Sequence, residues 1–148
     1  MKSFEEPVKL EYEILHKMFP AVNAKRGKIL KEKNLRGFVD TFNKYSNYFG
    51  IDTIEELKHF VSQVAHESDQ WNAYEEYASG SGYEGRKDLG NVVRGDGIRF
   101  KGRGPIQTTG RSNYKSVGDE ILKLSFLTTE QKSLFENDGI LKNPESLE

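Results

Sequence analysis

The chain has 148 residues, a length that predicts a single domain over residues 1–148. Its 22 Lys and Arg residues nearly balance its 23 Asp and Glu residues, and a net charge of −1 argues against nucleic acid as the main partner. Because the sequence contains no cysteine, disulfides, zinc–thiolate sites and thiol nucleophiles are excluded.

No stretch of the sequence approaches the roughly 20 consecutive apolar residues that cross a bilayer. Residues 1–15 mix charged and apolar side chains, whereas a secretory signal has a continuous apolar stretch. We therefore expect neither a signal peptide nor insertion into a membrane.

Three helices are predicted in the first half of the chain. Apolar residues one helical turn apart predict a helix over residues 8–19, which Pro20 ends. An apolar stripe over residues 35–45 predicts a second helix, and Thr53 with Glu56 forms a capping box for a third, which runs to residues 66–68. The basic residues between positions 25 and 36 are interpreted as a solvated loop and helix face rather than as an anion site.

The middle of the chain has a different character. Between Asp69 and Gly110 the helical period disappears, and nine glycines occur in 42 residues. This composition predicts loops and turns, with a short hairpin among them. The segment also carries aromatic residues, which favour a functional loop over disorder: Trp71, Tyr74, Tyr77, Tyr83 and Phe100.

Regular structure is predicted again after residue 110. Tyr114, Val117, Ile121 and Leu124 follow helical spacing, with Thr109 or Ser112 as the N-cap, and a further short helix is expected after Thr128 or Thr129. Asn143 and Pro144 are typical of a helix start, yet the chain ends at Glu148. The domain is therefore expected to be truncated at its C-terminus.

Two carboxylates are the leading catalytic candidates. Glu67 follows Val64 by three positions, so it lies on or beside the apolar stripe near the C-terminus of its helix, where desolvation and the helix dipole disfavour the ionised form. Such an environment suits a general acid. Glu76 follows nine positions later, and a pair of carboxylates of this kind equips a protein for glycoside hydrolysis. The spacing alone leaves competitors for the second role: Asp69, Glu75 and Glu84.

Metal and cofactor motifs fail on inspection. The His66-Glu67 pair lacks the second histidine of a zinc protease helix, because Gln70 stands in its place. The glycine pattern of residues 80–85 follows no predicted strand, which argues against a dinucleotide site. We therefore expect no metal and no cofactor.

Several strings of the sequence occur in the order typical of glycoside hydrolase family 19. They lie at residues 65–68, 75–76, 83–91, 95–97 and 100–114, and the last contains Gly-Arg-Gly-Pro-Ile-Gln. Over about residues 57–115 the chain resembles this family of chitinases, and most closely its phage and bacterial endolysin branch. The resemblance implies a mainly α, lysozyme-like fold in which a long glycine-rich loop or short hairpin lines a substrate cleft. It also implies further helices beyond residue 148.

The resemblance assigns roles to individual residues. Glu67 corresponds to the general acid, Glu76 to the general base, and Thr109 to a hydroxyl that orients the attacking water. Gln107, Asn113 and Tyr114 correspond to sugar-binding positions. Three further residues are candidates for substrate contact: His66, Trp71 and Arg103. Of these, Trp71 is equally suited to capping the core, and Arg103 to ion-paired scaffolding of the loop, together with Arg86, Asp88 and Arg111.

The resulting hypothesis is an inverting glycosidase without a cofactor that cleaves β-1,4 bonds of N-acetylglucosamine polymers, either peptidoglycan or chitin. We expect a bacterial or phage-encoded cytoplasmic protein that reaches the cell wall after release. Two alternatives stay open: a weak or inactive fragment that binds amino sugars, and a lytic transglycosylase-like enzyme that uses Glu67 alone.

Overall fold

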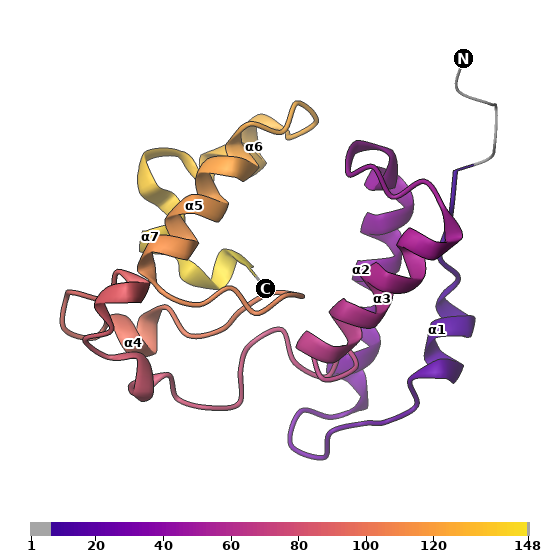
Figure 1. Cartoon of the computed structure of the whole chain (residues 1–148), viewed down its shortest axis with the longest axis horizontal. Coiled ribbons are helices and arrows are strands. Elements are labelled where there is room, and N and C mark those ends of the chain that lie inside the picture. The colour runs from indigo at the N-terminus through magenta and orange to yellow at the C-terminus, as the bar shows by residue number, and fades with distance from the viewer. Residues whose placement is uncertain (1–6, 148) are drawn as a thin grey trace. The chain divides into compact units, whose positions relative to one another are not determined.

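The computed structural model describes residues 7–147, which form seven α-helices and no β-strand. The mainly α, lysozyme-like fold class predicted from the sequence is confirmed. Contacts within the chain divide it into unit 1, Met1–Ala73, and unit 2, Tyr74–Glu148. Figure 1 shows the helices, whose bounds are α1 Tyr12–Met18, α2 Lys28–Tyr45, α3 Ile54–Glu67, α4 Asp96–Arg99, α5 Arg111–Leu122, α6 Thr129–Ser133 and α7 Gly139–Lys142. None of these helices is long and apolar enough to cross a bilayer.

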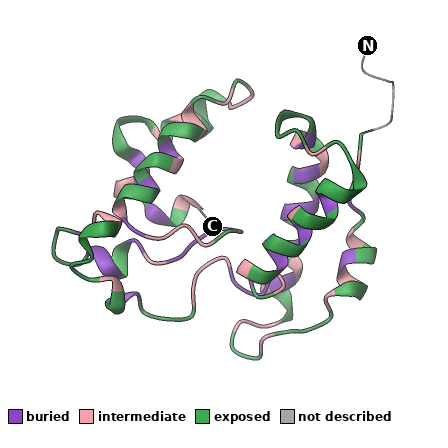
Figure 2. Ribbon diagram, viewed as in Figure 1, coloured by how far each residue is buried: buried purple, intermediate pink, exposed green. Residues whose placement is uncertain are grey.

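Unit 1 is built on α2 and α3, with α1 beside α2 (Figure 1). The Phe60 ring of α3 lies 5.8 Å from the ring of Phe38 and 5.9 Å from that of Phe42, both in α2. Trp71 is fully buried beneath this cluster, 5.3 Å from Phe38. Figure 2 shows the buried residues of this unit along α2 and α3. The three predicted helices are thus present, and the Thr53–Glu56 capping box is confirmed.

One part of the basic segment differs from expectation. Lys31 is buried, and its ammonium group donates to the backbone carbonyls of Phe19 and Ala21. Burial lowers the pKa of Lys31, while the negative charge of Asp69 acts in the opposite direction. The prediction of a solvated face is therefore wrong for Lys31, because this side chain satisfies carbonyls of the segment that joins α1 to α2.

Asn72 also binds the segment that joins α1 to α2. Its Oδ1 accepts from the N–H of Asn23 at 2.8 Å, and its Nδ2 donates to the carbonyls of Ala21 at 3.0 Å and Asp69 at 2.7 Å. The side chain is almost fully buried. Asn72 thereby ties the α1–α2 connection to the turn that follows α3.

The chain reverses sharply after α3. Asp69, Gln70 and Trp71 all have positive φ angles, of 49°, 56° and 63°. Ser68 stabilises this left-handed turn, because its hydroxyl donates to the carbonyl of Val64 at 2.7 Å and accepts from the N–H of Trp71 at 2.9 Å. Since such a conformation is costly for non-glycine residues, these hydrogen bonds fix the point where α3 ends.

The core of unit 2 contains Phe100, Tyr114 and Ile140, which bring α4, α5 and α7 together. A Cβ at Gly118 of α5 would lie 2.7 Å from Ile140, so the glycine permits close contact between α5 and α7. The predicted short helix is present as α6, with Thr128 as its N-cap.

The N-cap of α5 is Gly110, not Thr109 or Ser112 as the sequence predicted. Gly110 has a φ of +92°, and a Cβ there would lie 2.8 Å from the carbonyl oxygen of Leu89. The close approach of a distant backbone segment therefore selects glycine at this position, in place of a side-chain cap.

The glycine-rich segment contains the predicted turns and one additional short helix, α4. Two 3₁₀ turns, η2 at Ser81–Tyr83 and η3 at Lys87–Leu89, precede α4. The predicted hairpin is present as an isolated antiparallel pairing of Arg103 with Thr108.

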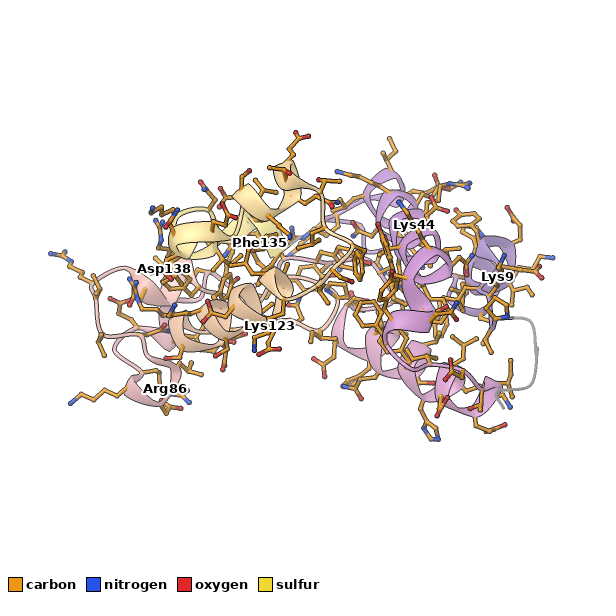
Figure 3. The ribbon with its side chains drawn as sticks, turned by 90° about the horizontal axis from the view of Figure 1, so that it is seen from above. Lys9, Lys44, Arg86, Lys123, Phe135 and Asp138 are labelled. Atoms are coloured by element: carbon orange, nitrogen blue, oxygen red, sulfur yellow. The ribbon has the colours of Figure 1, made fainter. Side chains whose placement is uncertain are left out.

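Charged side chains hold this segment together. Arg111 donates through Nε and Nη2 to both carboxylate oxygens of Asp96, at 2.9 and 2.7 Å. Arg86 pairs with Asp88 in the same two-point manner, at the surface. The expectation of ion-paired scaffolding is confirmed for these residues. Figure 3 labels Arg86 and two other exposed charged residues of unit 2, Lys123 and Asp138.

The helix start predicted at Asn143 and Pro144 is present near the end of the chain. Pro144 opens a 3₁₀ turn, η5, that spans Pro144–Leu147. The last residue of the predicted helix, Glu148, lies outside the described residues. Arg99 reinforces this region, since its guanidinium donates to the carbonyls of Leu141 and Lys142 at the end of α7.

We expect Asn72→Ala to lower the free energy of unfolding by about 3 kcal/mol, because three hydrogen bonds of a buried side chain are lost. Urea denaturation followed by circular dichroism measures this change. The exposed Asn47→Ala is the matched control and should alter stability by less than about 0.5 kcal/mol. Equal effects of the two variants would contradict the role given to Asn72.

A second prediction concerns acid stability. The hydrogen bonds from Arg111 hold the pKa of Asp96 below its ordinary value of 3.8, although burial opposes them. A carboxyl whose pKa is lower in the folded state stabilises the fold above its unfolded-state pKa, and this contribution disappears as the pH falls through the folded-state pKa. We therefore expect Asp96→Asn to cost about 2–3 kcal/mol near pH 6 and progressively less below pH 4.

The control for this experiment is Asp88→Asn, which removes an ion pair at the surface, where such pairs contribute little. Urea denaturation of the parent and both variants between pH 2.5 and pH 7 makes the comparison. A stability difference for Asp96→Asn that stays constant across this range would contradict the assignment.

Candidate functional site

Three separate segments of unit 2 meet beside Glu76. The N–H of Glu76 donates to the carbonyl of Gly102 at 2.8 Å, and the N–H of Gly104 donates to the carbonyl of Tyr74 at 2.6 Å. Arg103 and Thr108 exchange backbone hydrogen bonds of 3.1 and 2.9 Å. Residues 74–76, 102–104 and 107–109 therefore run alongside one another.

Gly102 lies at the meeting point of three side chains on these segments. A Cβ built on Gly102 would be 2.7 Å from Oε2 of Glu76, 2.9 Å from Oε1 of Gln107 and 3.3 Å from Oγ1 of Thr109. We call Glu76, Gln107 and Thr109 the oxygen cluster. The structure thus brings together three residues that the sequence singled out, and a side chain at position 102 would occupy the space between them.

Each member of the oxygen cluster has a hydrogen bond to the backbone. The N–H of Gly102 donates to Oε2 of Glu76. Gln107 donates through Nε2 to the carbonyl of Gly104 at 3.0 Å, so its amide oxygen faces the cluster, and Thr109 donates through its hydroxyl to the carbonyl of Gln107 at 3.0 Å. The side chains are only partly buried, which leaves them accessible to solvent.

The competing carboxylates have other partners. Glu75 forms an ion pair with Lys101. Glu84 accepts from the N–H groups of Gly95 and Gly97, at 2.7 and 2.8 Å, where it closes the start of α4. Asp69 is exposed in the left-handed turn of unit 1. Glu76 is accordingly the carboxylate of this group that lies in the oxygen cluster.

Tyr83 is a residue of the site that the sequence analysis did not select. The negative charge of Glu76 acts on its phenol. Burial is the main cause that raises the pKa of Tyr83, and the charge of Glu76 raises it further, so the phenol stays protonated at neutral pH. In the sequence Tyr83 stood only among the aromatics of the loop, and no spacing connects it to Glu76.

Three of the predicted sugar-binding residues have different surroundings. Asn113 is exposed in the first turn of α5, where its Nδ2 donates to the carbonyl of Thr109 at 2.8 Å. Tyr114 is fully buried, and its hydroxyl donates to the carbonyl of Lys101 and accepts from Nη1 of Arg103. Arg103 also donates to the carbonyl of Arg99 at 2.7 Å. Tyr114 and Arg103 thus support the backbone beneath the oxygen cluster, and their side chains present almost no surface to a ligand.

The remaining candidates belong to unit 1. Glu67 is the last residue of α3 and is half-buried, with Oε1 accepting from Nε2 of Gln63 at 2.9 Å. His66 beside it is exposed. Trp71 is fully buried among aromatic rings, so it lies in the core, which was one of the two interpretations of this residue. Within residues 7–147, no group of three or more His, Cys, Asp or Glu side chains is arranged to hold a metal ion.

Comparison with known proteins gives one relevant likeness. No protein-family model matches the sequence. Among solved structures, the chain resembles chitinase C from Streptomyces griseus HUT6037, with a TM-score of 0.55 and 20% sequence identity over 98% of this chain. The match covers 65% of the length of that chitinase. At this level of identity the likeness shows the fold alone, which is mainly α and lysozyme-like.

Proposed function

We propose that this chain is a glycoside hydrolase that cleaves β-1,4 bonds in polymers of N-acetylglucosamine. The observation that carries the proposal is the oxygen cluster, in which a carboxylate, an amide oxygen and a hydroxyl oxygen converge over a residue without a side chain. The fold shared with chitinase C adds support.

In the proposed mechanism Glu76 is the general base. Its carboxylate accepts a proton from a water molecule as that water attacks the anomeric carbon, and Thr109 and Gln107 hold the water through their oxygens. One proton of the water goes to Glu76, and the oxygens of Thr109 and Gln107 are acceptors for the other, so the water is oriented before it attacks.

Glu67 is the proposed general acid, which protonates the oxygen of the departing sugar. Its position at the end of α3 places a half-buried carboxyl at the negative end of a helix dipole. With one carboxyl as acid and the other as base on water, the reaction inverts the anomeric configuration and needs about 6.5–9.5 Å between the two groups.

The substrate class follows from the likeness to a chitinase and from the family resemblance of the sequence. Chitin and peptidoglycan share the β-1,4 bond and the N-acetyl group, so both are candidate substrates. Hydrolysis of peptidoglycan would make the chain an endolysin-type, bacteriolytic enzyme, and hydrolysis of chitin would make it a chitinase. His66 and Asn113, both exposed, are proposed sugar contacts.

The first test is mass spectrometry of soluble products from insoluble peptidoglycan and chitin, with the parent chain, Glu67→Gln and Glu76→Gln. We expect hydrated reducing fragments from the parent, and a loss of about 10²–10⁴-fold in rate for each variant, because each removes a proton-transfer group. The exposed Glu13→Gln should retain the parent rate.

Other products would identify the alternative functions. Anhydro ends that form normally in Glu76→Gln would indicate a transglycosylase-like reaction of Glu67 alone. Stabilisation of the fold by N-acetylglucosamine oligomers with no product from any variant would indicate an amino-sugar-binding protein. Either outcome would contradict the proposed hydrolysis.

A glycine substitution tests the oxygen cluster directly. Gly102→Ala places a methyl group within 2.9 Å of Glu76 and Gln107, and these side-chain ends must move apart. Because flexible side chains yield easily, we expect a loss of less than about 1.5 kcal/mol in unfolding free energy, but a decrease of about 10²-fold in hydrolysis.

The matched control is Gly82→Ala, since a Cβ at Gly82 meets nothing within 4 Å and its φ is not positive. Initial rates on a soluble N-acetylglucosamine hexamer and urea denaturation are measured for both variants. Gly102→Ala with the parent rate would show that the oxygen cluster takes no part in the reaction.

A further inference from the structure

One peptide group joins Glu76 to the interior of unit 2. It is the group between Lys101 and Gly102, whose N–H donates to Oε2 of Glu76 and whose carbonyl accepts from the hydroxyl of Tyr114 at 2.5 Å. A trans peptide group is planar, and its N–H and C=O point in opposite directions. The hydroxyl that holds the carbonyl on one side therefore sets the direction of the N–H on the other side.

Gly102 binds Glu76 through two backbone groups. Gly102 is buried, and a buried N–H is costly unless an acceptor faces it. That acceptor is the carboxylate of Glu76, while the carbonyl of Gly102 accepts from the N–H of Glu76 at 2.8 Å. The orientation of the Gly102 backbone therefore determines where the carboxylate of Glu76 lies.

Packing and charge fix the hydroxyl of Tyr114. The side chain is fully buried, and its ring lies 5.2 Å from the ring of Phe100 in the core of unit 2. The hydroxyl oxygen also accepts from Nη1 of Arg103 at 3.1 Å. A charged donor polarises the hydroxyl that accepts from it, so the hydrogen bond from this hydroxyl to the carbonyl of Lys101 becomes stronger.

The hydrogen bonds form a chain that runs in one direction. Arg103 donates to Tyr114, Tyr114 donates to the carbonyl of Lys101, and the N–H of the same peptide group donates to Glu76. Arg103 is held at the start of the chain, because its guanidinium also donates to the carbonyl of Arg99 at 2.7 Å. Hydrogen bonds aligned in this way strengthen one another.

We propose that Tyr114 is a positioning residue for Glu76, whose hydroxyl acts through the peptide group of Lys101 and Gly102 to hold the carboxylate toward the attacking water. This role rests on the proposed function, because Tyr114 acts through the general base. It replaces the sugar contact that the sequence suggested, since the side chain of Tyr114 is fully buried.

Kinetics of Tyr114→Phe on a soluble N-acetylglucosamine hexamer provide the first test. The ring remains, and only the hydroxyl that binds the carbonyl of Lys101 is removed. We expect kcat per folded molecule to fall about tenfold with KM unchanged within about twofold, because the base is misaligned while the sugar contacts remain.

The control for stability is Ile140→Val, which removes a methyl group from the same core and leaves the hydrogen bonds in place. Both variants should have lower urea midpoints than the parent, and Ile140→Val should keep the parent kcat. An unchanged kcat in Tyr114→Phe, or a fall that matches its loss of folded protein, would overturn the proposal.

A second background separates an effect through Glu76 from a merely structural one. In Glu76→Gln the base is already absent, so adding Tyr114→Phe should change the residual kcat by less than about twofold. A tenfold fall in both backgrounds would overturn the proposal, because Tyr114 would then act independently of Glu76.

Nuclear magnetic resonance examines the same chain of contacts without activity. In protein labelled with ¹⁵N and ¹³C, a scalar coupling across the hydrogen bond connects the amide nitrogen of Gly102 with the carboxyl carbon of Glu76. We expect this coupling in the parent, its loss in Glu76→Ala, and a smaller coupling in Tyr114→Phe, because the N–H no longer points at the carboxylate. Tyr12→Phe, the same chemical change in unit 1, should retain the parent coupling.

The measurements separate the possible failures. A coupling of parent size in Tyr114→Phe would overturn the positioning role, whatever the rate of that variant. Hydrolysis absent from the parent chain would overturn the proposed function, and the coupling would still decide whether Tyr114 orients the N–H that holds Glu76.

Discussion

The architecture of unit 2 depends on a short antiparallel contact between residues 74–76 and residues 102–104. Two backbone hydrogen bonds, Glu76 N–H to Gly102 and Gly104 N–H to Tyr74, close a loop of more than 20 residues. Closing a loop of this length costs chain entropy, and the same closure brings Glu76 to Gly102. The segments inside the loop can then fold against α5, because both loop ends are held. Without this contact the oxygen cluster would not exist, since Glu76 and Gln107 are 31 positions apart.

Charged residues in this half of the chain divide into two groups by environment. Asp96 and Glu84 are bound by a guanidinium and by backbone N–H groups, so they stabilise the loop and have little freedom for chemistry. Glu76 also accepts a hydrogen bond, from the N–H of Gly102, but it remains partly exposed at the point where Gly102 has no side chain. The absence of a Cβ at one residue therefore distinguishes the proposed catalytic carboxylate from the scaffolding ones.

The proposed acid, Glu67, belongs to unit 1, where the end of a helix positions it. The helix dipole and the partial burial of Glu67 come from its place at the end of α3, and that end is fixed by the left-handed turn at Asp69, Gln70 and Trp71. The turn is held by buried polar side chains, Ser68 and Asn72 among them. The strain of three positive φ angles is thus balanced by hydrogen bonds that also secure the α1–α2 connection.

The sequence by itself determined what depends on neighbours along the chain. The capping box at Thr53, the short helix after Thr128, the apolar stripes of α2 and α3, and the irregular glycine-rich segment were all predicted, because turns and helix starts are local interactions. Only the tertiary structure decided what depends on distant neighbours. It buried Lys31 and Tyr114 and made Gly110 the cap of α5. In each case a partner at least ten positions away supplies the carbonyl or the close backbone contact, and no local pattern encodes that partner.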